Sequence, residues 1–482
     1  MRLFSLLLLI ASGLVSACQA QESTQVNAAP VPRFEAVRPN EGFPVQVPSA
    51  FESTLGWLVV REDRTDPNSK EIRLPVAIIH GRSDDRKSPV VYLAGGPGTS
   101  AMRTAAFPGA YPWLADRDFI VFGHRGTHFA QPALMCPEYR EAVADGSRQI
   151  ESVQACRERL LSEGVDLDQY NSPNIAADLE DLRATLGITT WNLYGGSYGT
   201  RLALIYAKNY GDRIDSMVLD SPLPPNAMYD DQSAENLEAA LRAVARDCAR
   251  QAPCDAAFPD LENRFFQTLD EVSRSPLELD GESETITAPR LAALIPMTSE
   301  SSVTQAPLAM DLVARRDPET LRFAIGPWQA SDFAWGMRFS VWCSEALPFS
   351  IRYRSDGPGD TLGGYESAAI RPEICDAWGV TPLDADFVEP VSSDVPTLII
   401  SGEFDPSTPP RWGELAAQTL ANSLAVSVRG GSHSSTQQWG GDGCAMALAS
   451  EFIDAPDRVL MSPDATECLL RRPAPEYALN RD

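Results

Sequence analysis

Short runs of apolar and β-branched residues, each bounded by turn-forming residues, recur through the first half of the chain and return near its end. They predict strands at residues 56–62, 71–80, 90–93, 118–122, 190–194 and 216–219, and then at 396–401 and 424–428. The clearest helical pattern between them begins at Ser172 and Pro173, repeats apolar residues on one stripe to Leu186, and ends at Gly187. Because strands alternate with helices, the predicted fold class is α/β, with a mostly parallel sheet and helices on both faces.

The alternation stops between residues 229 and 390. This stretch is helical in pattern from Ser233 to Arg250 and irregular afterwards. It predicts a largely helical insertion, a cap over the carboxyl edge of the sheet, which divides the core into residues 51–228 and 391–482. Residues 18–50 are polar and rich in Pro and Ala, and they predict a tether and an irregular N-terminal segment.

Composition narrows the class of protein. The 482 residues are 44% hydrophobic and 22% charged, which is too apolar for a disordered chain. The 40 Lys and Arg residues against 66 Asp and Glu leave a formal charge of -26. Such acidity argues against nucleic acid or an anionic membrane surface as the main partner.

The N-terminus predicts export. Residues 1–17 place Arg2 before an apolar run from Leu3 to Val15, the layout of a signal peptide, and the run is too short to span a membrane. Residues 15–18 resemble a bacterial lipobox, which would make Cys18 a lipidation site; the alternative is ordinary cleavage after Ala20. In the lipoprotein families that this segment resembles, Gln19 favours the outer membrane. We expect a periplasmic or outer-membrane-anchored lipoprotein, with secretion as the alternative.

Eight cysteines remain once Cys18 is set aside, an even number in an oxidising compartment. Proximity in the sequence suggests four disulfides, and the alternative is that some of these residues are buried free thiols. The suggested pairs are Cys136 with Cys156, Cys248 with Cys254, Cys343 with Cys375, and Cys444 with Cys468.

The candidate nucleophile is Ser197. It stands in a Gly-x-Ser-x-Gly sequence, with Gly195 and Gly199, between a predicted strand and a predicted helix. A sharp strand-to-helix turn needs glycines because its backbone is crowded, and it lifts the serine hydroxyl into the site. The amides at the start of the following helix favour negative charge at the same point.

A serine nucleophile needs a base, and the chain has four histidines. His433 follows the last predicted strand, and Asp405 follows the strand before it, so the order Ser197, Asp405, His433 is the one expected for this type of elbow. Asp220, at the end of another strand, is the competing acid. Glu403 is expected to support the site from nearby.

The other histidines are assigned weaker roles. His80 ends a strand and is expected to be structural, whereas His124 and His128 are four residues apart and could share a metal ion, although no third ligand stands at a suitable spacing. The oxyanion hole requires two backbone donors. We assign them to Tyr198, next to the nucleophile, and Gly96, with Gly95 as the alternative.

These motifs together resemble the proline iminopeptidase and tripeptidyl aminopeptidase group of α/β-hydrolases, from about Gly56 onward. The residues that carry the resemblance are Gly95-Gly96-Pro97-Gly98, Gly195 to Gly199, Asp178 to Arg183, Gly402 to Asp405 with Thr408 to Pro410, Gly430 to His433, and the C-terminal segment with Cys444 and Cys468. The resemblance implies an α/β-hydrolase fold with an inserted cap. It also implies that Glu345, in the segment from Trp342 to Glu345, binds the free amino terminus of a peptide; the alternative is a solvated or arginine-paired carboxylate.

Two positions depart from the pattern of that group. Ala94 stands where the iminopeptidases usually have His, which puts the branch in question. The sequence from Gly123 to His128 replaces a usual Asp-Gln-Arg-Gly-x-Gly, keeping Arg125 and Gly126. The lost aspartate and the added imidazoles are expected to reshape the wall of the site.

The sequence therefore predicts a serine aminopeptidase of the prolyl or tripeptidyl type that needs no cofactor and acts on peptides with a free N-terminus. A carboxylic-ester hydrolase with the same triad is the alternative, because fold and triad do not fix the substrate. A non-catalytic binding lipoprotein is a third hypothesis, and the complete set of Ser, His, Asp and glycine motifs argues against it.

Overall fold

The structure is a computed structural model, and it describes residues 30–38, 42–145, 149–279, 285–324, 333–350, 372–438 and 441–481. The predicted signal peptide at residues 1–17 and the predicted lipidation site Cys18 lie outside the described residues. Among the helices in those ranges, none combines the length and the apolar character needed to cross a bilayer.

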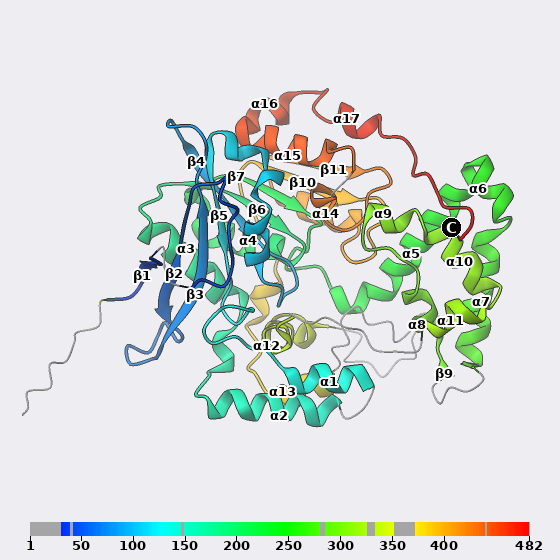
Figure 1. Cartoon of the computed structure of the whole chain (residues 1–482), viewed down its shortest axis with the longest axis horizontal. Helices are drawn as coiled ribbons and strands as arrows, with labels where there is room; N and C mark the ends of the chain where they lie inside the picture. The colour runs from blue at the N-terminus through cyan, green and yellow to red at the C-terminus, as the bar shows by residue number, and fades with distance from the viewer. Residues whose placement is uncertain are drawn as a thin grey trace, which may run out of the picture.

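A nine-stranded sheet forms the centre of the described chain (Figure 1). Its strands, in the spatial order β1-β2-β3-β5-β4-β6-β7-β10-β11, are parallel from β5 through β11 and antiparallel from β1 to the β3–β5 pair. The bounds are β1 Arg33–Ala36, β2 Ser53–Arg61, β3 Glu71–Ile79, β4 Lys87–Leu93, β5 Arg117–Phe122, β6 Trp191–Gly196, β7 Ile214–Asp220, β10 Thr397–Gly402 and β11 Ser423–Val428. The mostly parallel sheet and the eight strands expected from the sequence are confirmed.

Successive residues of the central strands enter different cores, as the two-residue period of a strand requires. In β4, Val91 and Leu93 belong to one core, and Val90 and Tyr92 belong to the other. The first core is closed by α3, α4 and α14, and the second by α15, α16 and α17. The bounds are α3 Ser172–Thr185, α4 Tyr198–Tyr210, α14 Pro410–Ala417, α15 Cys444–Asp454, α16 Pro456–Met461 and α17 Glu467–Leu470.

Two local predictions were wrong. Part of the segment expected to be irregular forms β1, an edge strand whose Arg33 donates two hydrogen bonds to Glu71, at 2.9 and 2.7 Å. The predicted cap residue of α3 is also one position late. Asn171 is the N-cap, and its side chain accepts a hydrogen bond from the Asn174 amide at 3.0 Å.

The predicted insertion falls into two parts. Its first part, which we call the outer lobe, comprises α5 to α11 and the β8–β9 hairpin, and most of it extends away from the sheet, at the right of Figure 1. A separate hydrophobic core holds it together. The bounds are α5 Tyr229–Arg250, α6 Ala252–Ala257, α7 Leu261–Arg274, β8 Leu277–Glu278, β9 Thr285–Ile286, α8 Ala288–Ala293, α9 Glu300–Val303, α10 Ala306–Ala314 and α11 Pro318–Arg322.

The second part of the insertion packs on the main core instead. Its helices α12 (Trp335–Glu345) and α13 (Pro372–Trp378) lie beside α1 (Pro137–Asp145) and α2 (Gln149–Ser162), below the sheet in Figure 1. The indole of Trp378 donates a hydrogen bond to Ser340 at 2.9 Å. Within the predicted insertion, α12 and α13 therefore share the core of the sheet, whereas the outer lobe has a core of its own.

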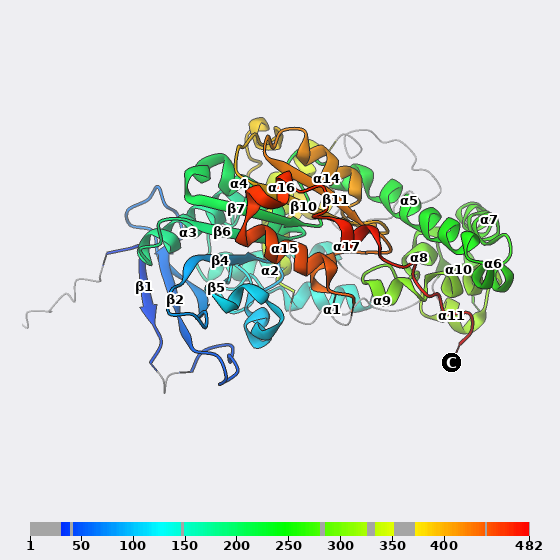
Figure 2. The same ribbon diagram turned by 90° about the horizontal axis from the view of Figure 1, so that it is seen from above.

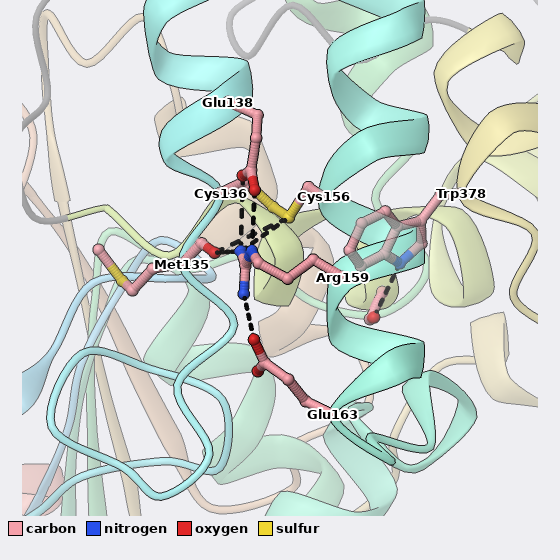
Figure 3. The surroundings of a disulfide bond; sticks show 8 residues. Met135, Cys136, Glu138, Cys156, Arg159, Glu163 and Trp378 are labelled. Atoms are coloured by element: carbon pink, nitrogen blue, oxygen red, sulfur yellow. Dashed lines mark hydrogen bonds and ion pairs between the residues drawn. A yellow bond between two sulfur atoms is a disulfide. The ribbon is translucent and has the colours of Figure 1, made fainter.

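All four predicted disulfides are present: Cys136–Cys156, Cys248–Cys254, Cys343–Cys375 and Cys444–Cys468. Figure 3 shows the first, which joins α2 to the residue that precedes α1. Arg159 reinforces the same junction by hydrogen bonds to Glu138 at 2.8 Å and to the Met135 carbonyl at 2.7 Å. The disulfides join helices to their neighbours and leave the strands unlinked.

The C-terminal tail runs from α17 to the outer lobe in both views (Figures 1 and 2). The Tyr477 hydroxyl donates to Asp247 at 2.9 Å, and the Ala478 amide donates to the Thr304 carbonyl at 3.0 Å. Arg481 bonds Glu319 at 2.7 Å. The tail therefore fastens the lobe to the rest of the molecule.

A fully buried ion pair supports the loop after β5. Arg125 donates to both oxygens of Asp178 at 2.7 Å, and it also bonds the carbonyls of Glu62 and Gln169 at 2.9 and 2.8 Å. Arg64, which is partly exposed, bonds the same carboxylate from outside. The arginine kept in the sequence pattern after β5 is thus a structural residue.

Replacing Arg125 by Ala should lower the free energy of unfolding by about 3–5 kcal/mol, because it leaves a buried carboxylate without its main partner. Arg64→Ala, the matched control, should cost about 1 kcal/mol or less, because that pair is partly solvated. Urea unfolding under non-reducing conditions measures both. Equal, small losses for the two variants would contradict the account of this ion pair.

Candidate active site

Ser197 stands at a strained turn between β6 and α4. Its dihedral angles are φ 55° and ψ -125°, a region that non-glycine residues seldom adopt. The Ser197 amide donates to the Asp220 carbonyl at 2.9 Å, which holds the turn against β7. A Cβ on Gly195 would lie 2.6 Å from the Gly199 carbonyl oxygen, and one on Gly199 would lie 1.9 Å from the Leu93 carbonyl oxygen. Both glycines are therefore needed for close packing.

His433 and Asp405 form a hydrogen-bonded pair in the loops that follow β11 and β10. The imidazole Nδ1 lies 2.8 Å from Asp405 Oδ2. The other oxygen of Asp405 accepts the amides of Ser407 and Thr408 at 2.8 and 2.9 Å, and the Thr408 hydroxyl bonds Oδ2 at 2.7 Å. The turn after β10 thus fixes a buried carboxylate that faces the imidazole.

This pair shifts both pKa values. Burial by itself raises the pKa of Asp405, but the positive charge of His433 and the hydrogen bonds from His433 and Thr408 outweigh it and hold the pKa below its ordinary value. For His433, burial by itself lowers the pKa of the imidazole. The charge of the Asp405 carboxylate and its hydrogen bond outweigh this effect and raise the pKa above 6.5. The arrangement stabilises a protonated imidazole, as a general base requires after it accepts a proton.

Asp220, the competing acid, does not bond the imidazole and has other hydrogen-bond partners. Its buried side chain accepts the amides of Ser435 and Thr436 at 3.0 and 2.9 Å, as well as the Thr436 hydroxyl. Burial raises its pKa to about 6, although the hydrogen bonds from Thr436 oppose the rise. Asp220 therefore bonds the loop that follows His433, whereas Asp405 bonds the imidazole.

The glycine loop after β4 lies against Ser197. A Cβ on Gly95 would stand 2.9 Å from Ser197 Cβ and 3.4 Å from Ser197 Oγ. Gly96 has φ +115°, a conformation that favours glycine. Tyr198, which directly follows the serine, is the first residue of α4. These residues come together at the carboxyl edge of the parallel strands.

Glu345, the last residue of α12, is fully buried. Its two oxygens accept the amide and the hydroxyl of Ser172, the latter at 2.6 Å, and the same hydroxyl lies 2.7 Å from that of Tyr198. Burial raises the pKa of Glu345 to about 7, against the charge of Arg201 and the bonds from Ser172. The sequence did not predict this series of hydrogen bonds, because the pattern around Ser172 indicated only the start of a helix.

Glu345 also lines a small pocket. The pocket lies between the first turn of α5, the end of α12 and the segment that follows β7, and its polar lining includes Arg201, Asp230 and Asp231. Arg201 is buried, and it donates to the Pro225 carbonyl at 3.0 Å. The carboxylate predicted to bind an amine thus lies near Asp230, Asp231 and Arg201, and Ser172 links it to the Tyr198 hydroxyl.

The remaining histidines and Glu403 make contacts that support the local fold. His80 lies 2.9 Å from the Thr54 hydroxyl and 3.2 Å from Asp118. Burial lowers the pKa of His124 to about 4, and His128 stacks on the neighbouring Phe129. Within the described ranges, no group of three or more potential ligands could hold a metal ion. Glu403 accepts the Gly430 amide at 2.8 Å and so supports the start of the His433 loop.

Comparisons with known proteins identify the fold family and several relatives of the chain. A family model described as the alpha/beta hydrolase fold matches residues 88–436. The serine protease Hip1 of Mycobacterium tuberculosis is 26% identical over 459 residues, which cover 85% of this chain and 86% of that protein. The tripeptidyl aminopeptidase of Streptomyces lividans is 31% identical over 194 residues, 36% of this chain and 35% of that protein. The proline iminopeptidase of Xylella fastidiosa is 46% identical over 104 residues, 22% and 28% of the two chains.

The two candidate acids can be separated by amide substitutions. Asp405→Asn should lower kcat on peptide amides and aryl esters by about 10⁴, because the imidazole loses the carboxylate that orients it and stabilises its charge. Asp220→Asn should cost at most about a hundredfold, because it weakens hydrogen bonds to a loop. Steady-state kinetics on both folded variants measures the difference. A larger loss for Asp220→Asn would reverse the assignment.

Proposed function

The chain belongs to the alpha/beta hydrolase family, and from that premise we propose that it is a serine aminopeptidase that uses Ser197, His433 and Asp405. The observation that carries the proposal is the 2.8 Å hydrogen bond that the His433 imidazole makes to the buried carboxylate of Asp405, in loops at the same sheet edge as the strained Ser197. The peptide would carry a free N-terminus, and the enzyme would release N-terminal residues or short peptides.

The proposed reaction proceeds through an acyl-enzyme. His433 takes the proton of the Ser197 hydroxyl as it attacks the scissile carbonyl carbon, and Asp405 orients the imidazole and stabilises its positive charge. The amides of Tyr198 and Gly96, or Gly95 in place of Gly96, bind the oxyanion. His433 then returns the proton to the leaving amine, and water hydrolyses the acyl-enzyme by the same steps. The sequence of steps uses no cofactor.

The names of the relatives favour peptides as the substrate. Relatives that align with this chain are named as a serine protease, a tripeptidyl aminopeptidase and a proline iminopeptidase. A prolyl or tripeptidyl specificity is the finer proposal. A carboxylic-ester hydrolase is the second candidate, because an oxyanion hole and triad of this geometry serve esters equally well. We also propose that the insertion at residues 229–390 restricts entry to the site.

We propose further that the protein is exported and anchored to the outer membrane by a lipid on Cys18. Four disulfides support export, because disulfides persist in oxidising compartments. The signal-like sequence at residues 1–17 supports the same proposal. Cleavage after Ala20 would instead release a periplasmic or secreted enzyme.

Glu345 is our proposed acceptor for the amino terminus of the substrate. It lines a pocket in which three carboxylates, those of Glu345, Asp230 and Asp231, stand against the one guanidinium of Arg201, and this excess of acidic groups favours a cation. Its oxygens are bonded to Ser172, and a bound ammonium group would have to replace one of these bonds. A pKa near 7 leaves part of the carboxyl groups ionised at neutral pH.

A panel of substrates tests the choice between peptidase and esterase. Free N-terminal prolyl, alanyl and tripeptidyl amides should be hydrolysed faster than their N-blocked counterparts and than short-chain aryl esters, measured as kcat/KM. Ser197→Ala should lose activity on every substrate. Hydrolysis of aryl esters alone by the wild-type protein would replace the aminopeptidase by the esterase.

Replacing Glu345 by Gln tests the amine site. We expect kcat/KM to fall about 10- to 100-fold for substrates with a free N-terminus, the value of a charge-assisted hydrogen bond, and to stay unchanged for N-blocked substrates. Ser172→Ala is the matched control, because it removes a bond to Glu345 but keeps the carboxylate. An unchanged preference in Glu345→Gln would exclude the role.

A further inference from the structure

The glycine loop beside Ser197 is braced by α12, a helix of the insertion. Arg338 of α12 donates a hydrogen bond to the Gly96 carbonyl at 2.8 Å. The Ala334 amide, just before the same helix, donates to the Gly98 carbonyl at 3.1 Å. A Cβ on Gly98 would lie 2.9 Å from the Ala334 carbonyl oxygen, so glycine is required for this approach. Residues at the start of α12 thus hold two of the four carbonyls of the Gly95–Gly98 loop in place.

Arg338 is itself held rigidly. Only 6% of the residue is exposed, and its guanidinium carbon lies 4.5 Å from the centroid of the Trp342 ring. The Trp342 indole donates to both carboxylate oxygens of Asp230, at 3.1 and 3.0 Å. A continuous chain of contacts therefore runs from Asp230 at the start of α5, through Trp342 and Arg338, to the backbone of Gly96.

The contact acts on the residue whose backbone amide the proposed reaction uses: Arg338 bonds the carbonyl of Gly96, and the amide of Gly96 is the proposed oxyanion donor. The direction of the Gly96 amide depends on the dihedral angles around Gly96, whose φ of +115° places it in a region open mainly to glycine. A fixed Gly96 carbonyl limits rotation on one side of this residue, which limits the positions that the amide can take. A hydrogen bond aimed at an oxyanion stabilises it only if the donor is held in place before the reaction.

The charge of Arg338 adds to this effect. A guanidinium stays protonated in proteins, and this one is buried next to the loop that faces Ser197. Charges interact more strongly in a low-dielectric interior than in water. A negative charge that develops on the substrate carbonyl is therefore favoured by a cation at this position, whereas the neutral substrate gains less.

We propose that Arg338 is a positioning residue for the oxyanion hole, which makes helix α12 of the insertion part of the machinery that stabilises the transition state. This inference rests on the proposed serine hydrolase function. It predicts an effect on the chemical step and little effect on substrate binding, because Arg338 acts through the Gly96 backbone.

The test compares Arg338→Met and Arg338→Lys with Arg117→Met in the full-length protein. Arg117 is the matched control, since it is also 6% exposed and donates to two backbone carbonyls, those of Ser88 and Ile453. It is the first residue of β5 and so lies at the amino end of that strand, away from the candidate site. The readouts are kcat and KM, and the rate of inactivation by a fluorophosphonate, which requires an active nucleophile and oxyanion hole. Thermal unfolding reports the stability of each variant.

In Arg338→Met we expect kcat and the inactivation rate to fall roughly 100-fold, as for loss of an oxyanion-hole contact, while KM changes less than about twofold. Arg338→Lys should lose less than Arg338→Met, because it keeps the charge but not the fork of donors. Arg117→Met should be destabilised without a change in kcat. If Arg338→Met does not fold, the lysine variant decides, and a fall in its kcat at constant KM supports the proposal.

Unchanged kcat and inactivation rates in the folded Arg338 variants would overturn the inference, and so would parallel changes in kcat and KM that match those of Arg117→Met. A wild-type protein that does not react with the fluorophosphonate would overturn the proposed function, and this inference with it. A reactive wild type with equally reactive Arg338 variants would overturn this inference alone.

Discussion

Asp220 connects the two halves of the site. Its backbone carbonyl accepts the amide of Ser197, and its buried carboxylate accepts two amides of the loop that carries His433. One residue at the end of β7 thus sets the position of the proposed nucleophile relative to the proposed base. The strain at Ser197 persists because the turn packs closely on itself and on the end of β4, so that glycines are needed on both sides of the serine.

The insertion is bound to this arrangement and is more than a cover over it. Phe404, adjacent to Asp405, is buried in the core of the outer lobe. Gln438 accepts the Glu300 amide at 3.0 Å and donates to the His433 carbonyl at 2.7 Å, so the start of α9 is bonded to the His433 loop. With α12 braced against the glycine loop, both parts of the insertion contact backbone next to proposed catalytic groups.

The sequence was sufficient for the features that depend on local pattern. Seven of the eight predicted strands carry runs of buried residues, the edge strand β11 being the exception, and the order Ser197, Asp405, His433 follows from which strands precede each residue. The strand β1 was missed because its four residues include two charged side chains, and because its pairing with β2 and the bonds from Arg33 to Glu71 join residues that are distant in the sequence.

Tertiary contacts decided what the sequence could not. The buried residues of α12 could pack equally well on the outer lobe or on the main core. The sequence of this helix therefore does not indicate which of the two cores it joins. Asp220 ends β7 and Asp405 lies just beyond β10, and only the course of the His433 loop assigns them different partners. The bond from Ser172 to Glu345 joins residues 173 positions apart.

The central claim, that Ser197 is the nucleophile of a hydrolase, is tested most directly by the site of covalent modification. The protein would be treated with a fluorophosphonate, digested, and analysed by mass spectrometry, with Ser197→Ala as the comparison. The account predicts one phosphonyl group on the peptide that contains Ser197, and none in the variant. Modification of a different residue, or no modification of the folded wild-type protein, would contradict it.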